Sequence, residues 1–90
     1  MLKVWADVAW SDYCKFFEEN QKKQIKMIHE LITDIERNGE GKGRGQPEPL
    51  KYELTGYWSR RIDLANRLVY KVDGDKLCII QCGTHYHKKK

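Results

Sequence analysis

The sequence predicts an α+β fold in which two N-terminal helices pack on a small, largely antiparallel β-sheet, in the order β-α-α-β-β-β. Three observations support this prediction. Apolar residues recur at helical spacing between residues 7 and 37, a segment rich in glycine and proline follows, and three runs rich in β-branched and aromatic residues lie beyond it. Because a chain of 90 residues is short, residues 1–90 are expected to form a single domain.

The N-terminal part of the chain contains the first predicted strand and both helices. Residues 2–5 mix aliphatic and aromatic side chains, as a short strand does. Apolar residues then recur at steps of three and four, which predicts helices from about Asp7 to Asn20 and from about Gln21 to Arg37. Asn38-Gly39 is a stop signal for the second helix. The two helices are expected to form an αα-hairpin.

The segment after the helices is predicted to be a loop. Four glycines alternate with polar residues between positions 39 and 45, and they are followed by Pro47-Glu48-Pro49, which neither a helix nor a central strand tolerates. Gly41-Lys42-Gly43 contains residue types of a nucleotide-binding P-loop. It lacks the Ser or Thr after the lysine and the strand-to-helix setting that such a loop needs, so a flexible basic connector is favoured.

Three strands are predicted after the loop. They are expected at about Tyr57 to Asp63, Arg67 to Val72 and Lys76 to Cys82, and Asp73-Gly74 is a strong hairpin signal between the last two. The three cysteines of the chain, an odd number, argue against a disulfide scaffold and are expected to be reduced.

Charge and hydropathy narrow the classes of function. The net charge is +4, but residues 1–40 hold six basic and eight acidic side chains (−2), whereas residues 41–90 hold eleven basic and five acidic ones (+6). The C-terminal half is therefore where a polyanion would bind. No stretch approaches the ~18 apolar residues of a membrane span, and Lys3, Asp7 and Asp12 interrupt the apolar stretch that a signal peptide needs, so none is expected. A cytoplasmic protein without membrane contact is expected.

Two residues are candidates for proton transfer. Glu48 lies between two prolines that fix the backbone, and a rigidly held carboxylate suits a general base. His85 carries the side chain that exchanges protons most readily near neutral pH, which suits a general acid. Glu48 as a solvated loop residue is an alternative interpretation. Cys82, His85 and His87 could also be zinc ligands, but no paired cysteines or fourth ligand accompany them, so no metal site is predicted.

Cationic side chains of the same half are candidates for phosphate binding. Strand alternation places Arg60 and Arg61 on opposite faces of the sheet. Whether Arg67 shares a face with Arg61 depends on the hairpin register, which the sequence leaves open. If it does, two guanidinium groups would face one phosphate. The alternative is a solvated sheet face on which Arg60 or Arg61 pairs with Asp63 or Glu53.

These residue types together are suited to cleaving RNA without a metal or cofactor. A base deprotonates the ribose 2′-hydroxyl, which attacks the adjacent phosphorus, cations stabilise the dianionic phosphorane, and an acid protonates the departing 5′-oxygen. The candidate base is Glu48 and the candidate acid is His85. The candidate phosphate-binding and base-stacking residues are Lys51, Arg61, Arg67, Tyr57 and Tyr86.

Several segments of the chain resemble a known family. Residues 43–51 (GRGQPEPLK), 54–62 (LTGYWSRRI) and 66–70 (NRLVY), together with His85-Tyr86, are similar to the YoeB/Txe toxins of the RelE superfamily. The resemblance extends over nearly the whole chain and includes the opening Trp5. It implies a RelE/YoeB-like fold, with a small sheet and two N-terminal helices, as the residue pattern also predicts.

The resemblance also implies a function. Such a toxin inhibits translation by entering the A site of the 70S ribosome, contacting small-subunit rRNA, and cutting mRNA there as an endoribonuclease. It is neutralised by a YefM/Axe-like antitoxin and forms a homodimer. By position, Glu48 matches the general base and His85 the general acid of the family. The remaining matches are Arg61 and Arg67 to phosphate-stabilising arginines, Lys51 to an active-site lysine and Tyr86 to the C-terminal tyrosine.

The chain departs from the family pattern near its C-terminus. Gly83-Thr84 stands where the family usually has a large basic or aromatic pair, and a basic tail at 87–90 follows the tyrosine at which the family tends to stop.

Two other functions are alternatives to the endoribonuclease. One is a non-catalytic fold relative that blocks a target, such as gyrase in the ParE branch, and the other is an RNA-binding protein that only coats phosphate.

Overall fold

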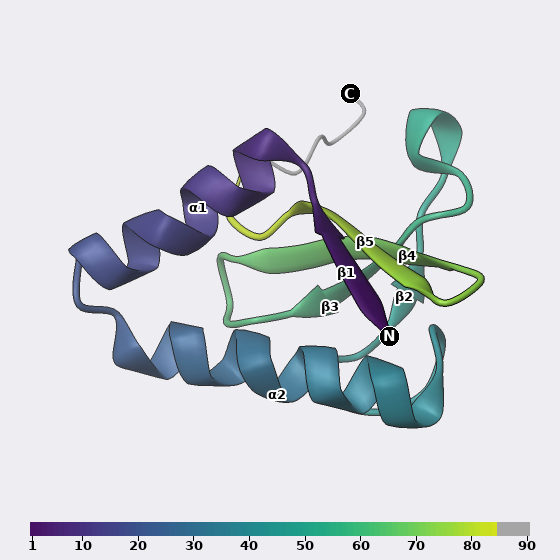
Figure 1. Ribbon diagram of the computed structural model, residues 1–90, viewed down its shortest axis with the longest axis horizontal. Coiled ribbons are helices and arrows are strands. Elements are labelled where there is room, and N and C mark those ends of the chain that lie inside the picture. Colours follow the sequence, from purple (N-terminus) through teal and green to yellow (C-terminus); the bar gives the residue numbers. More distant parts are fainter. Residues whose placement is uncertain (85–90) are drawn as a thin grey trace.

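A computed structural model describes residues 1–84, which form two helices packed on a five-stranded sheet (Figure 1). The strands are β1 (Leu2–Trp5), β2 (Glu48–Pro49), β3 (Trp58–Arg61), β4 (Arg67–Asp73) and β5 (Lys76–Gln81), the helices are α1 (Asp7–Glu18) and α2 (Lys22–Asn38), and a 3-10 turn, η1 (Tyr52–Leu54), precedes β3. The strand order is β1-β5-β4-β3-β2, with β1 parallel to β5 and the other neighbours antiparallel. The predicted α+β architecture is confirmed.

Local chemistry explains where the helices begin and end. Asp7 places a carboxylate in the first turn of α1, near the positive end of the helix dipole. The chain turns between the helices at Asn20, whose φ of 56° is a left-handed conformation that asparagine adopts more readily than most residues. α2 ends before Gly39, whose φ of 94° favours a residue without a Cβ. Both predicted helices are confirmed, with small differences at their ends.

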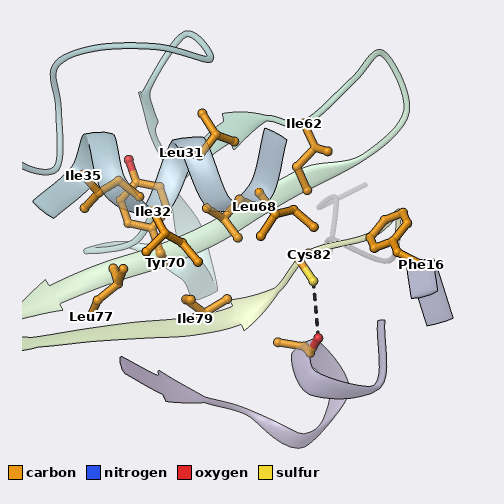
Figure 2. Packing of buried hydrophobic residues seen from close by; sticks show 12 residues of the cluster. Phe16, Leu31, Ile32, Ile35, Ile62, Leu68, Tyr70, Leu77, Ile79 and Cys82 are labelled. Atoms are coloured by element: carbon orange, nitrogen blue, oxygen red, sulfur yellow. Dashed lines mark hydrogen bonds between the residues drawn. The ribbon is translucent and has the colours of Figure 1, made fainter. Parts of the chain in front are cut away.

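The hydrophobic core lies between the helices and one face of the sheet. α2 contributes a stripe of buried residues at helical spacing, and β4 and β5 contribute side chains that alternate along each strand. Figure 2 shows how these side chains meet, and the cluster consists of Ala9, Phe16, Ile28, Leu31, Ile32, Ile35, Ile62, Leu68, Tyr70, Leu77, Ile79 and Cys82. Within residues 1–84, neither helix has the length and apolar character that a transmembrane span requires.

The strand predictions are confirmed except at the edge formed by β2. The segment around Glu48 was expected to be only a loop, but Glu48 pairs with Ser59 and Pro49 pairs with Trp58 in an antiparallel ladder. A proline is compatible with this position because an edge strand needs partners on one side only. β3 is shorter than predicted and ends at Arg61. All three cysteines are free, as expected.

The glycine-rich loop of residues 39–45 is anchored to the core, contrary to the expectation of a flexible connector. The guanidinium of Arg60, which is fully buried, donates hydrogen bonds to carbonyl oxygens of this loop. Its charge is balanced by Asp34 of α2. The interpretation that Arg60 lies on a solvated face and pairs with Asp63 or Glu53 was therefore wrong, because the alternation of β3 directs Arg60 toward the helices.

Replacing Leu68 by Ala tests the position of the core. Leu68 is 0% exposed, so Leu68→Ala should lower the free energy of unfolding by about 2–5 kcal/mol. Leu64, in the β3–β4 turn, is 89% exposed, so Leu64→Ala should change it by less than about 0.5 kcal/mol. Urea denaturation of both variants measures these values. Equal losses in the two variants would contradict the described packing.

Candidate functional site

Three of the predicted site residues share one face of the sheet. Glu48 is paired with Ser59, and Arg61, two residues beyond Ser59 on β3, is paired with Arg67 of β4. Paired residues, and residues two apart on a strand, project from the same face. Glu48, Arg61 and Arg67 therefore lie on the face opposite the helices, and the hairpin register brings the two arginines side by side.

The spacing of these residues suits a nucleotide linkage. Glu48 and Arg67 are separated by two interstrand steps of about 4.8 Å and two residues of about 3.4 Å each, so their Cα atoms lie roughly 12 Å apart. A Cα separation of this size is compatible with both side chains contacting one phosphate. Arg61 lies on the strand between them and is exposed.

Backbone hydrogen bonds on both sides of β2 hold Glu48 in place. The Arg61 N–H donates to the carbonyl oxygen of Gly45 (2.7 Å), and the Leu50 N–H donates to the carbonyl oxygen of Tyr57 (2.9 Å). Pairing with β3 thus adds to the constraint that the flanking prolines place on this segment. Glu48 is exposed, which leaves its carboxylate accessible to a substrate.

Arg67 is positioned by the turn that joins β3 to β4. Asp63 accepts hydrogen bonds from the backbone N–H groups of Ala65 (2.9 Å) and Asn66 (2.7 Å), which closes the turn. Nη1 of Arg67 donates to the carbonyl oxygens of Asp63 (2.9 Å) and Leu64 (3.2 Å). Its guanidinium is therefore held against the β3–β4 turn.

The electrostatics of the turn depend on Asp63. Burial raises the pKa of its carboxyl, but the hydrogen bonds from Gln24, Asn66 and Ala65 outweigh burial, so the net effect is a pKa below the usual range. The Gln24 amide donates to Asp63 at 3.0 Å and so links α2 to the turn. The carboxylate form of Asp63 is the one that the turn stabilises.

Two more predicted residues, Tyr57 and Lys51, lie in the connection between β2 and β3, and Lys71 of β4 contacts Tyr57. Tyr57 and Lys51 lie between β2 and β3, where Lys51 is exposed and Tyr57 is half-buried. The Lys71 ammonium of β4 stands over the Tyr57 ring, 5.1 Å from its centroid. Sequence reasoning missed Lys71. Its spacing of four residues from Arg67 indicates the same face of a strand, but its pairing with Tyr57 depends on the register.

The C-terminal candidates lie outside the described residues. His85 and Tyr86, and His87 of the alternative zinc set, are not among residues 1–84. Gly83, two positions before His85 in the sequence, accepts a hydrogen bond from the Arg67 N–H at 3.1 Å. The chain after β5 thus passes next to Arg67.

The Cys82 thiol donates to the carbonyl oxygen of Ala9 at 3.3 Å (Figure 2), and burial raises the pKa of this thiol to about 12.

Comparison with known proteins places the chain among bacterial toxins. The sequence profile described as "YoeB-like toxin of bacterial type II toxin-antitoxin system" matches residues 5–86. Toxin YoeB of Escherichia coli K12 is 45% identical over 86 residues, which cover 96% of this chain and all of the relative. The fold resembles a Staphylococcus aureus YoeB–YefM heterotetrameric toxin–antitoxin complex (TM-score 0.86, 47% identity, 96% of this chain and 99% of that one). It also resembles a Staphylococcus aureus YoeB dimer (TM-score 0.86, 46% identity, 96% and 98%).

The lowered pKa of Asp63 predicts how stability depends on pH. The carboxylate stabilises the folded chain above its unfolded-state pKa of about 3.9, and this contribution disappears as pH falls through that value toward the lower pKa of the folded state. Asp63→Asn should therefore be less stable than the wild type near neutral pH, and the difference should shrink toward about pH 3. Urea denaturation across this range measures it. A difference independent of pH would contradict the assignment.

Proposed function

Because the chain belongs to the YoeB-like toxin family of bacterial type II toxin–antitoxin systems, we propose that it is a ribosome-dependent endoribonuclease that cuts mRNA in the ribosomal A site. The observation that carries this proposal is the placement of Glu48, Arg61 and Arg67 on one sheet face. A carboxylate and two guanidinium groups on one face fit general-base attack on a phosphodiester.

Each side chain has a role in the proposed reaction. Glu48 accepts the proton of the ribose 2′-hydroxyl as its oxygen attacks the phosphorus. Arg61 and Arg67 bind the equatorial oxygens of the phosphorane, whose charge increases in the transition state. His85 donates a proton to the 5′-oxygen as its bond to phosphorus breaks, which leaves a 2′,3′-cyclic phosphate and a 5′-hydroxyl.

The remaining predicted residues bind the substrate. Lys51 in the β2–β3 connection and Lys71 beside Tyr57 extend the positive charge from the arginine pair along the mRNA backbone, toward the end of β3 away from the β3–β4 turn. Tyr57, with Lys71 over one face of its ring, offers a surface on which a base stacks. Tyr86 is assigned to stacking beside His85. No step of this reaction requires a metal or a cofactor.

The proposed partners follow from the charge distribution. The mRNA and the small-subunit rRNA of the 70S ribosome are polyanions that suit the +6 half of the chain, and the basic tail at 87–90 adds contact with them. The Staphylococcus aureus YoeB–YefM complex supports a YefM/Axe-like antitoxin as a partner. An acidic segment of such an antitoxin would be attracted to the same half of the chain and would cover it. The Staphylococcus aureus YoeB dimer supports a homodimer. Ribosome binding implies a cytoplasmic location.

Removing the proposed base tests the reaction. Glu48→Gln keeps the shape of the side chain but cannot accept the proton, so the rate of mRNA cleavage should fall roughly 10²- to 10⁴-fold. Primer extension on mRNA in a translating extract measures the cuts. Glu18→Gln, an exposed carboxylate on α1, is the matched control and should cut at the wild-type rate. Undiminished cutting by Glu48→Gln would refute the role of Glu48.

Changing the substrate tests the nucleophile. An mRNA with a single 2′-deoxynucleotide at a mapped cleavage position should bind but remain intact there, because it lacks the attacking hydroxyl. Cleavage at other positions of the same message is the internal control. The cut ends of unmodified mRNA should carry a 2′,3′-cyclic phosphate, and the reaction should require ribosomes. Efficient cutting at the deoxynucleotide would exclude this mechanism.

A further inference from the structure

The buried guanidinium of Arg60 lies directly behind the proposed site. Arg60 is adjacent to Arg61 in β3 but points to the opposite face, where it is 0% exposed. It forms an ion pair with Asp34 of α2 (2.5 Å), and its Nε donates to the Tyr70 hydroxyl (2.8 Å). A buried charge needs this many partners because each unmatched N–H would lose its hydration without compensation.

Within residues 1–84, the other hydrogen-bond partners of Arg60 belong to a single loop. Its two terminal nitrogens donate to carbonyl oxygens of residues 39–45, namely Lys42 (2.7 Å), Gly39 (2.9 Å), Arg44 (3.1 Å) and Glu40 (3.4 Å). The Tyr70 hydroxyl donates to the carbonyl oxygen of Glu40 (2.6 Å), and the Asp34 carboxylate accepts from the Arg44 N–H (3.0 Å). The path of the loop is therefore set by Arg60 together with Asp34 and Tyr70, which bind both Arg60 and the loop.

The packing of the loop leaves little room for a different path. A Cβ on Gly43 would overlap Oδ2 of Asp34. A Cβ on Gly45 would lie 2.9 Å from Leu31 and 3.1 Å from the Cβ of Arg60. Both glycines also have positive φ, 118° and 80°. The loop thus fits Arg60 and Asp34 closely at the positions nearest to β2.

The glycine-rich loop leads into β2, the strand that contains Glu48. The carbonyl oxygen of Gly45 accepts the Arg61 N–H at 2.7 Å, and three residues later Glu48 pairs with Ser59. β2 contains only two residues, so its own ladder fixes it weakly, and the anchored loop supplies the constraint on its N-terminal side. A displacement of about 1 Å at a reacting group can cost roughly 10²-fold in rate, so small shifts of this loop matter.

We propose that Arg60, held by Asp34, is a positioning residue that sets the place of the Glu48 carboxylate. This inference rests on the proposed role of Glu48 as the base. Buried ion pairs are often no more stabilising than apolar side chains of the same size, so stability alone does not account for a buried arginine here. The exposed pair between Arg44 and Glu30 also contacts the loop, but exposed pairs constrain geometry weakly.

A coupling experiment separates positioning from general stability. Asp34→Asn removes the charge that holds Arg60, and Gly43→Ala displaces Asp34 from the loop by a different route. Glu30→Gln is the matched control, because it removes the charge of an ion pair on the same helix and loop without touching Arg60. Each change is made in the full chain with Glu48 and with Glu48→Gln, and the single-turnover rate of mRNA cleavage is measured on saturating ribosome complexes.

The expected result is a loss that depends on Glu48. Asp34→Asn or Gly43→Ala should slow cleavage roughly 10- to 100-fold when Glu48 is present and less than about twofold in Glu48→Gln, with unchanged ribosome affinity. Glu30→Gln should leave the cleavage rate unchanged both with Glu48 and with Glu48→Gln. Equal losses in both backgrounds, or a loss explained by the unfolded fraction in a thermal melt, would overturn the proposal. Full activity of Glu48→Gln alone would instead overturn the proposed base and this inference with it.

Discussion

One buried charge, the guanidinium of Arg60, connects the elements behind the proposed site through the groups that satisfy it. Asp34 comes from α2, the carbonyl oxygens come from the loop of residues 39–45, and Tyr70 comes from β4. These contacts join the helix layer, the loop and the sheet at a single point between the layers. Loss of any one partner would leave a desolvated polar group, so the three elements are constrained together rather than in pairs.

Adjacent residues of the same type acquire opposite roles from the alternation of β3. Arg60 points toward the helices and is surrounded by protein, whereas Arg61 points to the other face and is exposed. Hydrogen bonds to fixed oxygens saturate the first guanidinium, so it serves the architecture. The second remains available to a phosphate. A slip of one residue in this strand would exchange these roles, and the contacts of Arg60 oppose such a slip.

The sequence predicts the features that depend on neighbouring residues and misses those that depend on distant ones. Both helices, the longer strands and the Asp73-Gly74 turn follow from local spacing, and the structure confirms them. β2 was missed because two residues show no period. The partnership of Arg60 with Asp34 joins positions 26 apart, and no local pattern indicates it. Glu48 and Arg67 are candidates that the sequence provides, but their common face required the register of two strand pairs.

The placement of Glu48 on an edge strand reconciles rigidity with access. A carboxylate on a central strand would be held firmly, but it would be flanked by strands on both sides, while one on a free loop would be accessible but variable in position. β2 pairs with β3 on one side only, and Pro49 has no N–H with which another strand could continue the sheet. Glu48 therefore keeps one side toward solvent, while the anchored loop before it and the β3 ladder beside it limit its movement.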